Sequence, residues 1–135
     1  MNIGHSRLHR WGLEAAEIHP CDKVLDVGCG GGKAIARILT QTRREVAGVD
    51  HSPEAVETTR RLNRSAIASG RLRVLEGSVD HLPFRDGFFD VVTAFETTYF
   101  WPDLRAGLVE IRRVLSPGGR LVITNELADR EAAGR

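Results

Sequence analysis

Aliphatic runs typical of buried strands alternate along the chain with stretches whose apolar residues recur every three or four positions, the spacing of one helix face. The runs predict strands at Val24–Val27, Glu45–Val49, Arg71–Glu76, Asp90–Phe95 and Arg120–Asn125. Strands separated by helices indicate a parallel sheet that helices cover on both faces. We therefore expect an α/β, doubly wound fold, in which ligands bind beyond the carboxyl ends of the strands.

Local signals set the ends of the predicted helices. Ser52-Pro53-Glu54 combines an N-cap, a proline at the first helical position and an acid near the positive end of the helix dipole. This helix is expected to run to about Gly70, a C-terminal stop. Asp103 can cap a later helix, which Ser116–Gly119 closes. The predicted inner faces are Leu8, Trp11, Ala15 and Ile18; Ala34, Ile35, Ile38 and Leu39; and Leu104, Leu108, Ile111 and Leu115.

Composition bounds the class of protein. The length of 135 residues and the hydrophobic content of 41% predict one domain over residues 1–135, with an N-terminal capping helix within 1–20 and a core over 21–126. The formal charge of +1 gives no reason to expect nucleic acid. No apolar run has the length of a signal peptide or a membrane span, and Cys21 and Cys29 lack zinc-type spacing. We expect a small-molecule partner, no membrane, no metal and a cytoplasmic location.

The segment VLDVGCGGGK, from Val24 to Lys33, places four glycines within five residues directly after the first strand. Glycine tolerates positive φ and carries no side chain, so Gly28 and Gly30–Gly32 are expected to form a floor against which a ligand lies. A dinucleotide-binding fingerprint needs a small residue where Lys33 stands, and a P-loop needs Ser or Thr where Ala34 stands. The pattern disfavours both phosphate-binding readings.

Two aspartates lie beside this loop in the predicted fold. Asp26 is inside the first strand, where a carboxylate would repel a pyrophosphate and attract a cation. Asp50 ends the second strand, twenty residues after Gly30, where an acid accepts hydrogen bonds from both hydroxyls of a ribose. The expected ligand is a nucleoside with positive charge near the loop. The alternative for Asp50 is a turn residue before a helix.

Four segments, in this order, resemble the motifs of class I S-adenosylmethionine-dependent methyltransferases: VLDVGCGGGK, VAGVDHSPEAV, EGSVDHLPFRDGFFDVVTAF and VLSPGGRLVITNE. The likeness covers about Cys21–Glu126 and is strongest to the group, with a methyltransferase type 11 domain, that includes ubiquinone and menaquinone biosynthesis C-methyltransferases. It implies a Rossmann-like fold, S-adenosylmethionine as cofactor, and methyl transfer to a small-molecule acceptor. Such an in-line displacement needs alignment and exclusion of water, and no covalent catalytic residue.

The resemblance also implies roles for individual residues. The glycine loop would pass under the methionine part of the cofactor, Asp26 would help to hold the ammonium through water or the loop, and Asp50 would clamp the ribose. Relatives often carry Asp where this chain has Ser78, so Ser78 or Asp80 accepts from the adenine amine, or backbone and apolar contacts hold the ring. The main chain at Phe95 would receive the amino group. The implied cofactor-binding residues are Asp26, Gly28, Cys29, Gly30, Asp50, His51, Ser78, Val79 and Phe95.

No catalytic residue is assigned, since a general base is needed only when the acceptor must lose a proton of high pKa. The acceptor-side candidates are Glu96, Tyr99 and His5, with Thr97, Trp101 and Asn2 beside them. Tyr99 and Trp101 are equally well explained as anchors for the following helix, and His5 as an exposed residue of an N-terminal arm.

Members of this superfamily continue after the fifth strand into a helix and an antiparallel strand pair, whereas this chain ends at Arg135. We expect a core without those strands, whose fifth strand is an open edge that invites a partner, including a second copy of the chain. The alternative function is therefore a non-catalytic S-adenosylmethionine-binding module, or a truncated subunit that needs a partner chain. A dinucleotide oxidoreductase is disfavoured by Lys33 and Asp26.

Overall fold

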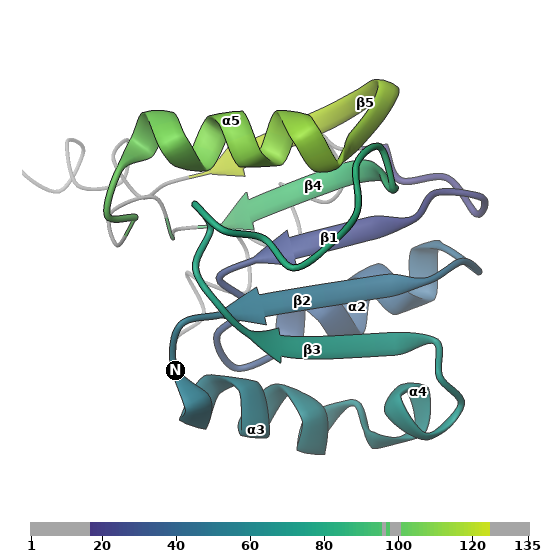
Figure 1. Cartoon of the computed structure of the whole chain (residues 1–135). Helices are drawn as coiled ribbons and strands as arrows, with labels where there is room; N and C mark the ends of the chain where they lie inside the picture. Colours follow the sequence, from purple (N-terminus) through teal and green to yellow (C-terminus); the bar gives the residue numbers. More distant parts are fainter. Residues whose placement is uncertain (1–16, 96, 98–100, 125–135) are drawn as a thin grey trace, which may run out of the picture.

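The computed structural model describes residues 17–95, 97 and 101–124. Five strands form one sheet in the order β3-β2-β1-β4-β5, and every pairing among them is parallel. Their arrowheads point to the same side in Figure 1, so their carboxyl ends meet at one edge of the sheet. The predicted parallel α/β fold is confirmed. The strands are β1 (Val24–Val27), β2 (Val46–Asp50), β3 (Leu72–Glu76), β4 (Phe89–Phe95) and β5 (Leu115–Thr124).

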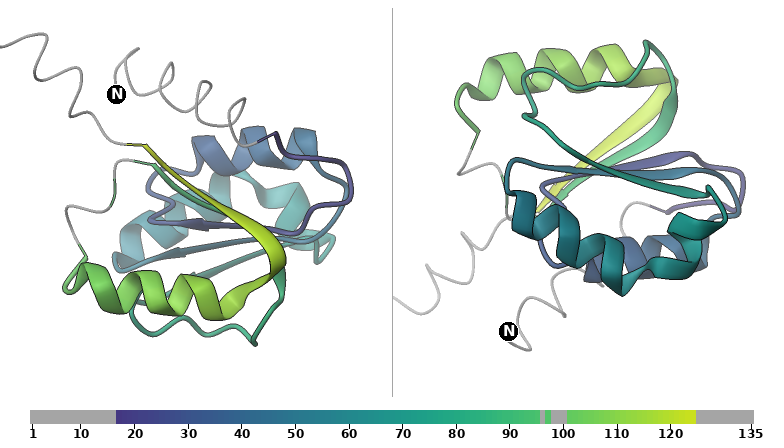
Figure 2. Two further views of the ribbon diagram at one scale, coloured as in Figure 1. Left: turned by 90° about the horizontal axis from the view of Figure 1, so that it is seen from above. Right: turned by 60° about the horizontal axis from the view of Figure 1, so that its bottom comes forward.

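Helices cover both faces of this sheet (Figure 2). On one face lie α2 (Lys33–Gln41), α3 (Pro53–Leu62) and α4 (Arg64–Ala68), and on the other lies α5 (Leu104–Val114). The chain builds outward from β1 to β3 and then returns to place β4 on the other side of β1. Because crossovers between parallel strands are right-handed, this reversal puts the later helix on the opposite face. The reversal also leaves a crevice at the carboxyl ends of β1 and β4, where ligands bind in such sheets.

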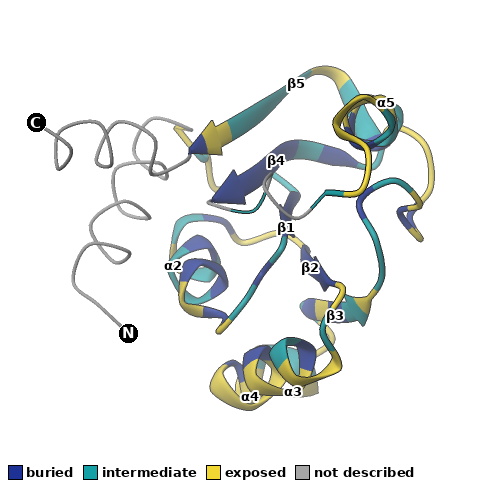
Figure 3. Cartoon of the chain, turned by 90° about the vertical axis from the view of Figure 1, so that its left-hand side faces the viewer, coloured by how far each residue is buried: buried dark blue, intermediate teal, exposed yellow. Residues whose placement is uncertain are grey.

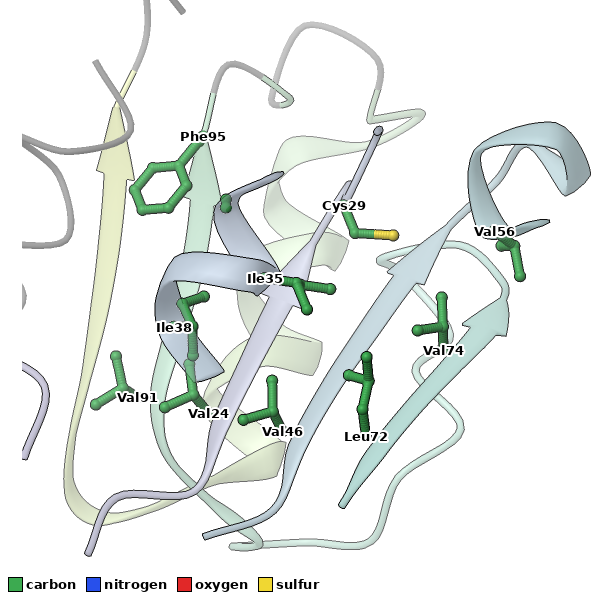
Figure 4. Close-up of a cluster of buried hydrophobic side chains, with 11 residues drawn as sticks. Val24, Cys29, Ile35, Ile38, Val46, Val56, Leu72, Val74, Val91 and Phe95 are labelled. Carbon is green, nitrogen blue, oxygen red and sulfur yellow. The ribbon is translucent and has the colours of Figure 1, made fainter. Parts of the chain in front are cut away.

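The hydrophobic core has two halves, one on each face of the sheet. In β1, Val24 belongs to the cluster under α2 and α3, whereas Leu25 and Val27 belong to the cluster under α5. This alternation follows from the two-residue period of a strand. Figure 4 shows the first cluster, with Ile35 and Ile38 of α2 directed at the sheet. In Figure 3 the central strands are buried while the outer surfaces of α3 and α4 are exposed.

The predicted helix starts are confirmed. Ser52 Oγ accepts from the Ala55 N–H at 3.2 Å with Pro53 in the first turn, and Asp103 Oδ1 accepts from the Ala106 N–H at 3.2 Å. One predicted end is wrong, because the helix that begins at Pro53 does not run unbroken to Gly70. It stops at Leu62, and α4 follows after Asn63, whose ψ of 41° departs from helical geometry.

The N-terminal helix and the buried face of α5 also differ from the sequence expectation. The N-terminal helix predicted to include Ile18 lies outside the described residues except for its end, where Glu17 and Ile18 are not helical and Glu17 has a φ of 52°. The inner face of α5 is wrong in part, because Leu104 and Leu108 are exposed. The residues of α5 buried against the sheet are Gly107, Ile111 and Val114.

The strand β5 begins at Leu115, earlier than predicted. Leu115 pairs with Phe89 and Arg120 pairs with Val91, so the segment 116–119 makes a register shift inside the strand. Gly118 has a φ of 80°, which a glycine accommodates without strain. The segment 116–119, which was predicted to close the helix, is therefore an irregular part of β5.

Candidate functional site

A cavity of about 160 Å³ opens at the carboxyl edge of the sheet, beside the glycine loop. Its walls come from the ends of β1 and β2, from the segment after β3 and from the segment before α5. Valine side chains and one proline supply the apolar part, and Asp50, His51, Ser78 and Thr97 supply polar groups. Its lining residues are Val27, Gly28, Val49, Asp50, His51, Gly77, Ser78, Val79, Thr97, Trp101 and Pro102.

Asp50 ties this cavity to the glycine loop. Its Oδ2 accepts from the Gly30 N–H and its Oδ1 from the Ser52 N–H, both at 2.9 Å. His51 Nδ1 lies 3.5 Å from Oδ1 on an exposed ring. A carboxylate has about four lone-pair sites, so two further hydrogen bonds can still be accepted. Asp50 therefore holds the loop and keeps acceptor capacity toward the cavity, where it is 8% exposed.

The four glycines of the loop have different neighbours, and the predicted floor for a ligand stays a prediction. A Cβ on Gly28 would lie 2.1 Å from Thr97 Oγ1, and one on Gly32 would lie 2.9 Å from the Thr59 Cα. These two glycines therefore make room for the protein's own chain. A Cβ on Gly31 would meet nothing within 4 Å, and one on Gly30 would meet only the Gly28 carbonyl at 4.0 Å. The loop surface is open at Gly30 and Gly31, while Gly28 lines the cavity.

Two side chains of α3 bind the carbonyls of this loop. Thr59 Oγ1 donates to the Gly30 carbonyl at 2.9 Å, and Asn63 Nδ2 donates to the Gly32 carbonyl at 3.3 Å. Both side chains are buried. Sequence analysis did not select them, because a polar residue on a helix carries no mark of which loop it will face. The only signal was their polarity at positions of α3 that continue the buried side marked by Val56.

Asp26 lies in the seam between β1 and β4 and is 2% exposed. Its Oδ1 accepts from Thr93 Oγ1 at 2.7 Å. Burial raises the pKa of Asp26 to about 7; the hydrogen bond from Thr93 opposes that rise, and the nearby Asp50 charge adds to it. The carboxyl is not among the residues that line the cavity. Its predicted influence on a bound cation stays a prediction and would act through the loop.

Cys29 points away from the cavity into the first core cluster (Figure 4). Its Sγ lies 3.5 Å from Thr59 Oγ1, and the side chain also lies against the position of Gly48. Burial raises the pKa of the Cys29 thiol to about 12, so the thiolate that a nucleophile requires is not formed at neutral pH. The Cys29 side chain therefore packs in the core, and the cofactor-binding role implied for this residue stays a prediction.

Ser78 and Asp80 form one unit beside the cavity. Ser78 Oγ lies 2.5 Å from Asp80 Oδ1, and because a carboxylate only accepts, Ser78 donates this hydrogen bond. The serine oxygen is thereby left as an acceptor, and Ser78 lines the cavity while Asp80 does not. Arg113 of α5 holds the segment 77–88 in place, since it donates to the Leu82 and Phe84 carbonyls at 2.9 and 2.8 Å.

Trp101 closes the cavity from the side of α5. A Cβ on Gly107 would lie 2.9 Å from Trp101 Cε3 and 3.1 Å from Val79 Cγ1, so this glycine of α5 provides the seat for the indole ring. Its Nε1 is buried, and no described residue accepts from it. Trp101 thus packs against the helix and lines the cavity, and its predicted contact with the acceptor stays a prediction.

The remaining predicted site residues divide into two groups. Phe95 ends β4, and its side chain is buried in the first core cluster, so only its main chain can face a ligand (Figure 4). Glu96, Tyr99 and His5 lie outside the described residues, as do Asn2 and Glu126. The acceptor side therefore stays a prediction from the sequence, and the described site is the cofactor side.

The fold and this site have counterparts among known proteins. The model of a methyltransferase domain matches residues 25–123, from β1 to β5. The chain belongs to the methyltransferase domain family. An O-methyltransferase of Pyrenophora dematioidea is 34% identical over 110 residues, which make up 82% of this chain and 41% of that protein. The methyltransferase GfsG of Streptomyces halstedii is 37% identical over 112 residues, 83% of this chain and 40% of its own length.

Solved structures of other methyltransferases share the fold. Geranyl diphosphate C-methyltransferase from Streptomyces coelicolor, crystallised with S-adenosyl-L-homocysteine, superposes with a TM-score of 0.79 at 25% identity. The superposition covers 88% of this methyltransferase domain and 43% of that chain. A methyltransferase structure in complex with the Haloferax volcanii Trm112 activator superposes with a TM-score of 0.78 at 32% identity, over 89% of this chain and 52% of that one.

This domain spans about half or less of the length of the curated relatives that it matches. Within the described part of the chain, no helix has the length and apolar character needed to cross a membrane. The same residues contain no group of three His, Cys, Asp or Glu side chains arranged for a metal ion.

Proposed function

We propose that this domain binds S-adenosylmethionine at the carboxyl edge of its sheet and transfers the methyl group to a small-molecule acceptor by in-line displacement. The observation that carries the proposal is Asp50, which joins the glycine loop to the cavity and retains two acceptor sites for a ribose. Family membership and a structural neighbour crystallised with S-adenosyl-L-homocysteine support it.

The residues present fit such a cofactor. Gly30 and Gly31 leave the loop surface open for the methionine part, and Asp50 faces the place of the ribose. The apolar walls of the cavity suit a planar base, and the Trp101 N–H is a buried donor for which no described residue is the acceptor. The cavity is smaller than the roughly 300 Å³ at which pockets for whole ligands begin, which suits one part of an elongated molecule that otherwise lies over the loop.

Each residue then has a defined task. Ser78 donates its proton to Asp80, so the Ser78 oxygen accepts from the amine of the base. Of the two candidates for this contact, Ser78 makes it and Asp80 orients Ser78. Val79 and Val49 pack on the base, His51 flanks it, and the main chain at Phe95 faces the amino group. When bound, the cofactor supplies an electrophilic methyl group on a sulfonium. The protein aligns it with the acceptor and excludes water, and Glu96, Tyr99 and His5 stay the proposed acceptor-side residues.

The first test is isothermal titration of the purified chain with S-adenosylhomocysteine, with NAD run alongside. We expect saturable binding of the first ligand only, weakened at least about a hundredfold in Asp50→Ala, since charge-assisted hydrogen bonds contribute roughly 1.5–3 kcal/mol each. Glu57→Ala, an exposed change on α3, is the matched control and should bind normally. Heat from NAD alone would overturn the proposal.

Catalysis is tested separately, by incubating the chain with S-adenosylmethionine and a panel of phenols, carboxylic acids, amines and activated carbon acids. Methylation that disappears in Asp50→Ala supports the enzyme. The relatives include both O- and C-methyltransferases, so the acceptor atom is left to this panel. The narrower placement beside the ubiquinone and menaquinone enzymes, and the cytoplasmic location, stay predictions.

A second function is a cofactor-binding module that needs another chain. It is favoured by β5, which ends the sheet with Ile123 38% exposed, and by exposed Leu104 and Val109 on α5. Unpaired edges of this kind attract further strands. A methyltransferase of similar fold is known in complex with an activator. Binding of S-adenosylhomocysteine without turnover, together with self-association in light scattering or a stable complex with a second chain, would favour this function over the first.

A further inference from the structure

The helix α3 contacts the glycine loop more closely than packing alone requires. The missing Cβ of Gly32 brings the loop to within 2.9 Å of the Thr59 Cα, and Thr59 Oγ1 donates to the Gly30 carbonyl at 2.9 Å. One turn later, Asn63 Nδ2 donates to the Gly32 carbonyl and also to the Thr59 carbonyl at 3.0 Å. The helix breaks at this residue, so Asn63 serves the loop at the expense of a continuous helix.

These bonds fix the direction of the peptide groups in the loop. Every described peptide bond is trans, and in a trans peptide the carbonyl and the following N–H point in opposite directions. Thr59 draws the Gly30 carbonyl toward α3, so the Gly31 N–H is directed away from α3, toward the open side of the loop. No described residue accepts from the Gly31 N–H, and a Cβ on Gly31 would meet nothing within 4 Å.

The preceding peptide group, between Cys29 and Gly30, is fixed by Asp50, which accepts from the Gly30 N–H. The Gly30 N–H is therefore held on one side by β2, and the Gly30 carbonyl on the other side by α3. Glycine has no side chain to restrict its own φ and ψ, so without external bonds these peptide planes could rotate freely. The loop closes one turn of its own, with the Gly32 N–H donating to the Cys29 carbonyl at 3.0 Å, and Asp50 and Thr59 fix the peptide groups inside that turn.

We propose that Thr59 is a positioning residue for cofactor binding, assisted by Asn63: its hydroxyl sets the Gly30–Gly31 peptide so that the Gly31 N–H is presented to an acceptor atom of the bound cofactor. The inference rests on the proposed function. It assigns a role to α3, a helix that lines no part of the cavity, and it explains why a fully buried helix position carries a hydroxyl. A ligand that meets a pre-oriented donor loses less entropy in ordering the loop.

The test compares Thr59→Val, which keeps the shape and removes the hydroxyl, with Thr59→Ser, which keeps the hydroxyl. The probe is S-adenosylhomocysteine, and its affinity is measured by isothermal titration. We expect about tenfold weaker binding for Thr59→Val, the scale of one hydrogen bond, and binding within about threefold of wild type for Thr59→Ser. The Gly31 amide is followed by NMR in all three proteins, and its resonance should move on ligand addition in wild type and Thr59→Ser.

A purely structural role is separated by a stability control. Ile38→Val removes one methylene from the first core cluster, the one under α2 and α3, and leaves the loop residues unchanged. Thr59→Val and Ile38→Val are both measured by urea unfolding, and only Thr59→Val should lose affinity. Equal affinities for all four proteins would overturn this inference and leave the proposed function standing. Absence of binding to the wild-type chain would overturn the proposed function and this inference with it.

Discussion

The end of β2 and the seam between β1 and β4 each place an aspartate near the same loop, in opposite environments. Asp50 accepts hydrogen bonds from two backbone N–H groups and borders the cavity. Asp26 has one hydroxyl partner, Thr93, and is enclosed by the sheet. Burial raises the pKa of Asp26 to about 7. Residue type therefore does not settle the charge of an acid in this site; the number of donors around it and its access to water do.

The same contrast divides the loop itself. Gly30 and Gly31 face open space, whereas Gly28 and Gly32 are occupied by Thr97 and Thr59 of the same chain. The two threonines reach the loop from opposite sides, from the segment after β4 and from α3. An added side chain would therefore find space at Gly30 and Gly31 and none at Gly28 or Gly32.

The largest expected effect comes from removing the charge of the enclosed acid. The unfolded chain releases the Asp26 proton near its ordinary pKa of 3.8, while the folded chain retains it to about pH 7. Between those values the folded state binds more protons, so its stability falls as pH rises. A shift of this size corresponds to about 4 kcal/mol.

Asp26→Asn should flatten this dependence. In urea unfolding, we expect the variant to be more stable than wild type at pH 8 by up to about 4 kcal/mol and similar at pH 4. The free energies of unfolding of wild type and Asp26→Asn are compared between pH 4 and 7. If their difference stays constant while both rise, the raised pKa of the buried Asp26 carboxyl is contradicted.

Removing the charge of Asp50 should act on binding more than on the pH dependence of stability. Asp50→Asn keeps one oxygen acceptor and loses the charge-assisted bonds to Gly30 and Ser52, so we expect about tenfold to hundredfold weaker binding of S-adenosylhomocysteine. The measurement is isothermal titration at pH 6 and pH 8. An affinity equal to that of wild type would contradict the proposed role of this carboxylate.

A cationic ligand should couple to Asp26 through its charge. A cation near the loop favours the ionised carboxylate, so it lowers the Asp26 pKa and binds more tightly above that pKa. Wild type should therefore bind S-adenosylhomocysteine about fivefold more tightly at pH 8 than at pH 6, if the pKa falls from about 7 by about one unit. Asp26→Asn should show no such change, and an equal pH dependence in both proteins would place the titrating group elsewhere.

The smallest expected effect comes from removing the Thr93 hydroxyl, which lowers the pKa of Asp26. Thr93 Oγ1 donates to Asp26 and lowers its pKa against the effect of burial. Thr93→Val removes the bond and should raise the pKa further, which costs the folded state about 1 kcal/mol at pH 8. The Asp26 carboxyl can be titrated by carbon NMR in both proteins. An unchanged midpoint would show that burial alone sets this pKa.

The strand and helix pattern was largely readable from the sequence, since the burial of β1 and β2 on both faces appears as aliphatic runs interrupted only by Asp26 and Gly48 before β2 ends at Asp50. The breaks were not. Asn63 ends α3 because its side chain bonds the glycine loop, and Leu104 and Leu108 are exposed because Trp101 is seated on Gly107. The Asn63 contact joins segments 31 residues apart, and the Trp101 contact joins a loop residue to the helix that follows it; periodicity carries no trace of either.

The sequence by itself determined the parallel α/β order, the glycine loop and the acids beside it, because each is encoded in a contiguous run of residues. Only the tertiary structure decided which glycines are open, that burial raises the pKa of Asp26, and which helix holds the loop. These are properties of packing: the reversal of strand order between β1 and β4 brings Thr93 to Asp26, and the crossover through α3 brings Thr59 to Gly30. The packing of the helices on the sheet decides which residues a side chain contacts, and these contacts decide its charge and its role.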